Sequence, residues 1–147
     1  MPPLPTATLL FQHPPNGNRI ARRPLRSFLI DTARRITGDR AITCLITDDR
    51  HLESLNRQFR SKNAPTDVLS FPWENGGGEI AISLDTAARQ AAEFGHGLEQ
   101  ELRILILHGL LHLAGMDHET DSGEMARAEM KWRKRLGLAP GLIERSR

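Results

Sequence analysis

Residues 98–114 contain the feature that most restricts how this chain can fold. Seven leucine and isoleucine side chains between Ile104 and Leu113 make the segment apolar on nearly every side. A helix with this pattern has no face suited to water, so it must be buried among other elements. It also contains His108 and His112, and buried imidazoles without partners are costly. The sequence therefore predicts a central helix whose two histidines have specific partners.

The rest of the chain predicts a sheet covered by helices. Short apolar runs between turn residues predict four strands, at residues 6–12, 40–47, 66–71 and 79–84. Apolar residues at helical spacing predict about five helices, at residues 18–37, 48–59, 85–94, 98–114 and 121–136. Pro65 and Pro72 place the third strand near a sheet edge, and Pro140 is expected to end the ordered part.

These elements indicate a single α+β domain over residues 1–147, with a mixed four-stranded sheet. No segment reaches the ~20 apolar residues that a membrane helix requires, and the N-terminal residues do not resemble a secretory signal. We therefore expect a cytoplasmic protein without a membrane span. Cys44 is the only cysteine, so a disulfide framework within the chain is excluded, and a buried apolar role is expected for it.

Charge is segregated along the chain although the net charge is only +2. Residues 19–40 contain seven arginines against two aspartates, and residues 126–147 contain seven basic residues against two glutamates. Residues 79–124, in contrast, contain nine acidic residues and two arginines. The basic segments fit either ordinary solvated helix faces or a surface that binds nucleic-acid phosphates.

Three of the six histidines fall within eleven residues, in the segment HGLLHLAGMDH that begins at His108. His108 and His112 are four residues apart, so on a helix they face the same side. Gly115 is placed to end that helix and turn the chain back, which would return His118 to the same point. Three imidazoles predict one Zn²⁺ ion with an open coordination position, as in hydrolytic rather than structural zinc sites.

The HxxxHxxGxxH spacing resembles that of metzincin zinc proteases, which have a glutamate directly after the first histidine as general base. Here that position is Gly109. A glycine within a helix costs ~1 kcal/mol relative to alanine, so it indicates a packing or access requirement. Because the glutamate that would act as general base is missing, peptide hydrolysis is the least favoured function for this chain.

Three sequence blocks together resemble the YbeY family of bacterial zinc-dependent endoribonucleases. They are HGLLHLAGMDH at residues 108–118, LNRQFRSKNAPTDVLSFPWE at residues 55–74 and GEIAIS at residues 78–83. The resemblance implies cleavage of single-stranded RNA, maturation of the 3′ end of small-subunit ribosomal RNA, and ribosome quality control. Ribosomal RNA, the ribosome or its small subunit is the implied partner.

By position, the resemblance places the zinc ligands at His108, His112 and His118 and a functional arginine at Arg60. Arg60 and His108 are thus the implied catalytic residues. A guanidinium can pair with a phosphate through two hydrogen bonds, which gives Arg60 a chemical reason for this role. The nucleophile, either water or the RNA 2′-hydroxyl, is left open, and no general base is evident. A ribosome-assembly protein that binds RNA and has a non-catalytic zinc site is the main alternative.

Several polar residues near the motif have more than one interpretation. Asp117 could orient an imidazole or cap the following segment. Glu119, Asp121 and Glu124 are expected to serve the N-terminus of the next helix. His51 and His96 are expected at the surface, His96 because it lies between two glycines.

Overall fold

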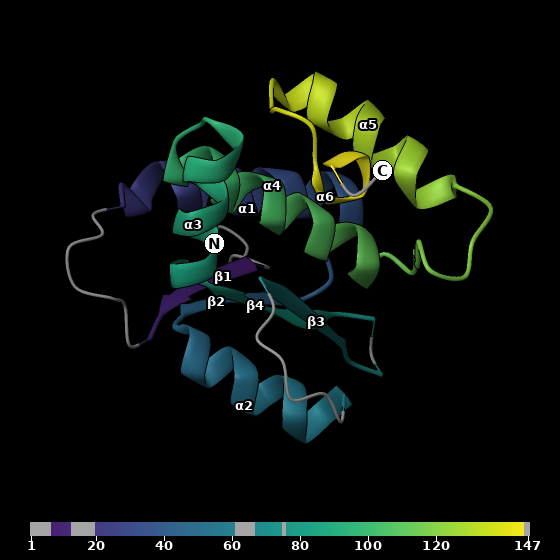
Figure 1. Cartoon of the computed structure of the whole chain (residues 1–147). Helices are drawn as coiled ribbons and strands as arrows, with labels where there is room; N and C mark the ends of the chain where they lie inside the picture. Colours follow the sequence, from purple (N-terminus) through teal and green to yellow (C-terminus); the bar gives the residue numbers. More distant parts are fainter. Residues whose placement is uncertain (1–6, 13–19, 61–66, 75, 146–147) are drawn as a thin grey trace, which may run out of the picture.

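A four-stranded sheet lies between one helix on one face and a group of helices on the other (Figure 1). The computed structural model describes residues 7–12, 20–60, 67–74 and 76–145, with only the backbone described at Phe59 and Arg60. Helix α2 (Asp49–Arg60) covers one face of the sheet, and α1 (Arg22–Thr37), α3 (Leu84–Phe94) and α4 (Leu98–Leu113) cover the other. Helices α5 (Glu124–Leu136) and α6 (Leu142–Arg145) pack beyond α4.

The strand order is β1-β2-β4-β3, formed by Ala7–Phe11, Ile42–Thr47, Gly78–Ser83 and Val68–Pro72 respectively. β1, β2 and β4 are parallel, and β3 runs antiparallel to β4 at the edge. The mixed sheet and the edge position of β3 confirm the sequence predictions. β2 is buried on both faces, because Leu45 packs on the side opposite Ile42, Cys44 and Ile46.

Helix α4 is the centre of the molecule, as its apolar sequence predicts. It contacts α1, α3, α5, α6, β3 and β4. Gly109 explains how it can lie so close to the sheet: a Cβ there would be 2.9 Å from Cγ2 of Ile80 on β4. The glycine is therefore a packing requirement of the fold.

Local signals account for several helix ends. The carboxylate of Asp48 accepts a hydrogen bond from the His51 backbone N–H (2.9 Å) at the start of α2. Gly115 has φ +100°, the left-handed conformation expected after α4.

Residues after Pro140 do not form the simple tail that the sequence predicts, because α6 folds back onto α4 and α5. None of the described helices is long and apolar enough to cross a membrane.

Candidate metal centre

The three histidines of the sequence motif converge at the C-terminal end of α4. His108 and His112 lie on one face of this helix, and the turn at Gly115 brings His118 back beside them. The ring centroids are 4.8 Å apart for His108 and His112, 5.5 Å for His108 and His118, and 5.6 Å for His112 and His118. One potential ligand atom from each residue lies within 4.8 Å of the other two. The arrangement is therefore suited to holding one metal ion.

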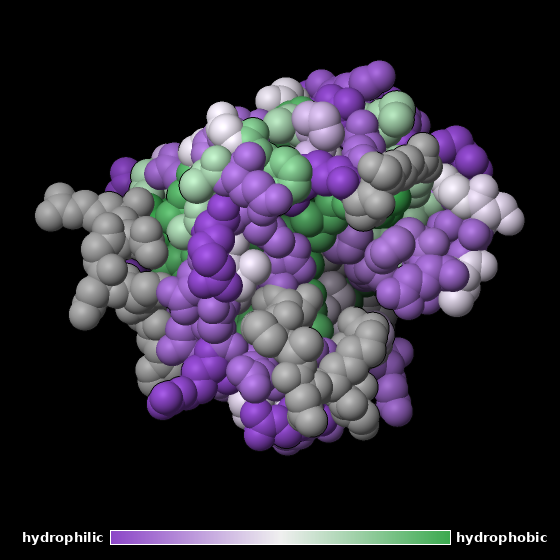
Figure 2. Space-filling view, viewed as in Figure 1, coloured by the Kyte–Doolittle hydropathy of each residue, from purple (hydrophilic) through white to green (hydrophobic). Residues whose placement is uncertain are grey.

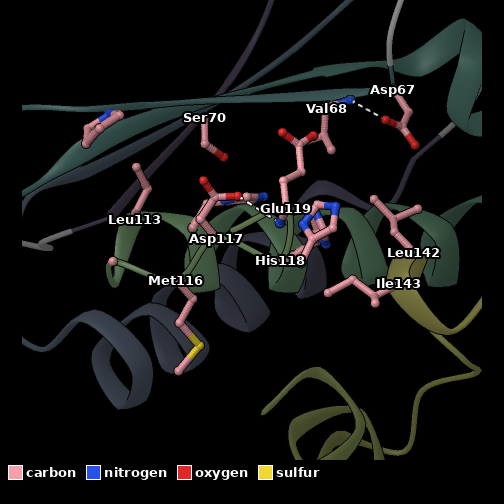
Figure 3. A pocket seen from close by; sticks show the side chains of 14 residues that line it. Asp67, Val68, Ser70, Leu113, Met116, Asp117, His118, Glu119, Leu142 and Ile143 are labelled. Carbon is pink, nitrogen blue, oxygen red and sulfur yellow. Dashed lines mark hydrogen bonds between the residues drawn. The ribbon is translucent and has the colours of Figure 1, made fainter. Parts of the chain in front are cut away.

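The histidine cluster lines a pocket of about 610 Å³. One wall is formed by Val68, Ser70 and Pro72 of β3 together with Asp67, which precedes the strand, and another by Leu142 and Ile143 of α6. The segment after α4 closes the pocket, with the side chains of Asp117, His118 and Glu119 lying below β3 in Figure 3. On the face seen in Figure 2, hydrophobic residues are visible between the two halves of the molecule, while hydrophilic residues cover most of the outer surface.

Exposure increases through the cluster from the buried His108 to the partly buried His112 and the exposed His118. Burial, with the neighbouring rings of His108 and His118, lowers the pKa of His112 to about 4. Asp117 and a hydrogen bond to the Met116 backbone oppose this decrease. His112 is thus neutral at physiological pH, which is the form that binds a metal ion.

The donor set fits a borderline-soft divalent ion such as Zn²⁺ better than Mg²⁺ or Ca²⁺, because imidazole nitrogens supply all three ligand atoms. Among the described residues, no other group of three or more histidine, cysteine, aspartate or glutamate side chains meets at one point. Cys44 does not belong to this group; it lies fully buried on β2, and burial raises the pKa of its thiol to about 12. The three-histidine group can therefore hold a metal and leave room for an additional ligand.

Asp117 stabilises the turn rather than orienting a ring. Its carboxylate accepts a hydrogen bond from the Glu119 backbone N–H (3.1 Å), and its carbonyl accepts one from Thr120 N–H (3.2 Å). Of the two interpretations of Asp117, the structure favours capping. The turn holds the backbone on both sides of His118.

Asp121 caps the next helix, as predicted. Its two oxygens accept hydrogen bonds from Gly123 N–H (2.9 Å) and Met125 N–H (2.8 Å). These backbone bonds hold the pKa of the carboxyl below its ordinary value. Glu124 accepts a hydrogen bond from Ser122 N–H (2.7 Å) in the same turn. Asp121 and Glu124 therefore serve the start of α5, whereas Glu119 lines the pocket.

One contact of the cluster was missed by sequence reasoning. Oε2 of Glu129, on α5, lies 2.9 Å from Nδ1 of His108, and Glu129 is only 1% exposed. A signal was present in the sequence, because Glu129 follows Met125 and Ala126 on the buried stripe of an otherwise amphipathic helix. A carboxylate on such a stripe requires a partner.

The predictions for Arg60 and His96 have different outcomes in the structure. Arg60 is the last residue of α2, but its side chain lies outside the described part of the structure, so its role remains a prediction. The prediction that His96 lies at the surface is wrong. Its side chain is 9% exposed, and Nε2 lies 2.6 Å from Oε1 of the fully buried Glu101. His51 is partly buried.

Fold and site together define an α+β protein with a three-histidine pocket that can hold a metal ion. Residues 19–137 match the family described as Endoribonuclease YbeY. The chain belongs to this family. The match includes all three histidines and Arg60, and it confirms the resemblance seen in the sequence blocks.

Relatives and a solved structure agree with this assignment. A protein from Solibacter usitatus, named Endoribonuclease YbeY, is 52% identical over 126 residues, which cover 84% of this chain and 86% of that protein. One of the same name from Koribacter versatilis is 50% identical, over 82% of this chain and 81% of its own. The solution structure of TM1509 from Thermotoga maritima has a TM-score of 0.60 at 30% identity, with 86% of this chain and 85% of that chain covered.

Proposed function

We propose that this protein is a zinc-dependent endoribonuclease that cleaves single-stranded RNA during maturation of the 3′ end of small-subunit ribosomal RNA. The whole chain acts as one metal-dependent hydrolase domain in the cytoplasm and contributes to ribosome quality control. His108, His112 and His118 hold the ion, and Arg60 contacts the phosphate. The support comes from family membership and from the observation that these three imidazoles converge in an open pocket.

The charges around the pocket explain why both an ion and Arg60 are required. Asp67, Asp117 and Glu119 line it, and none of the described lining residues is a lysine or arginine. A phosphodiester would therefore meet an acidic environment unless a cation is supplied. A bound Zn²⁺ would provide a Lewis acid for a phosphoryl oxygen. The Arg60 guanidinium would pair with the remaining phosphate oxygens and stabilise negative charge as it develops.

The basic helices provide a surface for the rest of the RNA strand. Arg22, Arg23, Arg26, Arg34 and Arg35 of α1, and Arg127, Lys131, Lys134 and Arg135 of α5, are exposed. Contacts between such side chains and phosphates depend little on sequence and weaken as the salt concentration rises. We assign to them the affinity for RNA, while the pocket is responsible for cleavage.

Two variants test the proposal. His108→Ala should reduce the zinc content and abolish cleavage of a 3′-extended small-subunit ribosomal RNA fragment. Arg60→Glu should keep the zinc and lose cleavage, because the ligands remain while the phosphate contact is replaced by repulsion. Zinc content, measured on rigorously purified protein, and RNA cleavage are the readouts. Undiminished cleavage by metal-free His108→Ala protein would contradict the proposal.

The alternative of a ribosome-assembly protein with a non-catalytic zinc site predicts a different pattern. In that case His112→Ala protein would still bind the ribosomal particle, and the native protein would bind RNA without cutting it. Analysis of the cleaved ends separates the two possible nucleophiles. A 2′,3′-cyclic phosphate identifies attack by the RNA 2′-hydroxyl, and its absence from the initial products identifies attack by water.

A further inference from the structure

We infer that Glu129 is the positioning residue of the metal centre, because it holds His108 in the tautomer that leaves Nε2 free for the ion. This inference rests on the proposed zinc site and assigns a role to a residue outside the histidine motif. Glu129 acts through His108 and does not itself contact RNA or the ion.

The geometry around the carboxylate determines which atom donates and which accepts. Oε1 of Glu129 accepts a hydrogen bond from the Ile143 backbone N–H (3.0 Å), and Oε2 lies 2.9 Å from Nδ1 of His108. Because an ionised carboxylate only accepts hydrogen bonds, we assign the hydrogen of His108 to Nδ1. The unprotonated Nε2 then remains available as a metal ligand. Histidine ligands in metal sites are commonly held in this way by an acceptor on the other nitrogen.

Because His108 and Glu129 are both buried, the groups that compensate the Glu129 charge matter for stability. His108 is 6% exposed and Glu129 is 1% exposed. Among the described residues, the hydrogen-bond partners of Glu129 are His108 and the Ile143 backbone. Arg133 is attracted to Glu129, but its guanidinium is engaged by Glu144 at 2.6 and 2.9 Å. Because an uncompensated buried charge is costly, an ion bound to His108 would stabilise the Glu129 carboxylate.

The C-terminal segment is shaped around the same carboxylate. A Cβ at position 141 would collide with Oε1 and Cδ of Glu129, so only glycine fits there without a shift. Two residues later, the chain donates the Ile143 N–H to that oxygen. The side chain of Ile143 also lines the metal pocket. The buried backbone at Gly141 and the start of α6 thus cover Glu129 and close one side of the site.

Glu129→Gln is the most informative variant because it keeps the shape of the side chain. Its amide oxygen can still accept from Ile143, which leaves the NH₂ group facing Nδ1 of His108. That amide donates, so Nδ1 would become an acceptor and the hydrogen would move to Nε2, where it blocks the metal. Loss of such an outer partner typically weakens metal binding by about 10- to 100-fold.

The test measures zinc affinity by competition with a chelator, together with urea unfolding of the metal-free protein. For Glu129→Gln we expect a zinc affinity about 10- to 100-fold lower and a metal-free unfolding midpoint no lower than that of the wild type. A merely structural role would instead lower the metal-free midpoint and leave zinc affinity unchanged, which would overturn the inference. Glu144→Gln is the matched control, because it changes the α5–α6 contact without touching His108; its zinc affinity should be unchanged.

A measurement on the wild type avoids any dependence on a variant. Long-range ¹H–¹⁵N spectra of the metal-free chain in mildly alkaline buffer should show the hydrogen of His108 on Nδ1. A hydrogen on Nε2 would overturn the inference even if the protein binds zinc. If the wild type binds no zinc, both the proposed function and the inference about Glu129 fail. If the wild type and Glu129→Gln bind zinc equally well, only the role of Glu129 fails.

Discussion

The pKa of His112, in the histidine cluster, is lowered by its surroundings. Its folded-state pKa is about 4, against an ordinary value of 6.5. Between these two pH values the unfolded chain binds a proton that the folded chain does not. The part of the unfolding free energy that depends on His112 is therefore at its highest above pH ~6.5, and it decreases as the pH falls towards 4.

This shift predicts that the metal-free protein loses stability on mild acidification. Between pH 6.5 and 4.5, His112 should account for a decrease of about 1 kcal/mol, since solvent screening reduces the effect at a partly exposed side chain. Urea unfolding at several pH values measures it, with His112→Asn as the comparison. The variant should show a shallower pH dependence; parallel curves for the two proteins would contradict the assignment.

At the residue scale, sequence reasoning succeeded where the relevant atoms are close in the chain. His108 and His112 are one helical turn apart, and Gly115 marks the turn that returns His118. It failed for Glu129, which meets His108 from 21 residues away. It also failed for His96, whose partner Glu101 is only five residues away, because Glu101 is buried where it pairs with Arg145, 44 residues later in the chain. Such contacts depend on how elements pack, which local patterns do not specify.

At the scale of the elements, the packing of α4 against the sheet depends on its close approach to β4. Gly109→Ala places a methyl group 2.9 Å from Cγ2 of Ile80, so the helix or the isoleucine must move. Overpacking costs about 1–3 kcal/mol, and the better helix propensity of alanine offsets about 1 kcal/mol of this cost, so we expect a net loss of up to about 2 kcal/mol. Urea unfolding measures this value. Gly97→Ala is the control, because no atom lies within 4 Å of the added Cβ; an equal loss in both variants would refute the packing explanation.

The short helix α6 depends on tertiary contacts. Four residues cannot form a stable helix alone, and this one is held by Arg145, whose guanidinium donates to both oxygens of Glu101 at 2.8 and 3.0 Å. This dependence explains why the sequence predicted only a tail after Pro140. The pairing residue, Glu101, lies 44 positions earlier in the chain.

Arg145→Ala should therefore destabilise the protein substantially. The pair is buried, with side chains 8% and 0% exposed, and removal of Arg145 leaves His96 as the side-chain partner of Glu101 within the described part of the chain. We expect a loss of about 3 kcal/mol in the free energy of unfolding. Arg89→Ala breaks an ion pair whose arginine is 62% exposed and should cost under about 1 kcal/mol. Similar values for both variants would show that burial of the Arg145 pair has no special effect.

At the scale of the whole molecule, the basic residues of α1 and α5 are separate from the acidic residues of the pocket. The exposed basic residues of α1 and α5 lie outside the set that lines the pocket. Charge reversal at Lys131 and Lys134 should therefore weaken RNA binding and make it less dependent on salt, with zinc content unchanged. Filter binding at several salt concentrations measures this effect. An unchanged affinity and salt dependence would place the RNA on another surface.

We propose that three imidazoles hold one zinc ion whose coordination remains open. Zinc K-edge X-ray absorption of the isolated protein, combined with its zinc content, tests it most directly. We predict one zinc per chain, three histidine nitrogen ligands at about 2.0–2.1 Å, and an additional exchangeable ligand that responds to added anions. An ion enclosed by four protein side chains, or a site with fewer than three histidine ligands, would contradict the account.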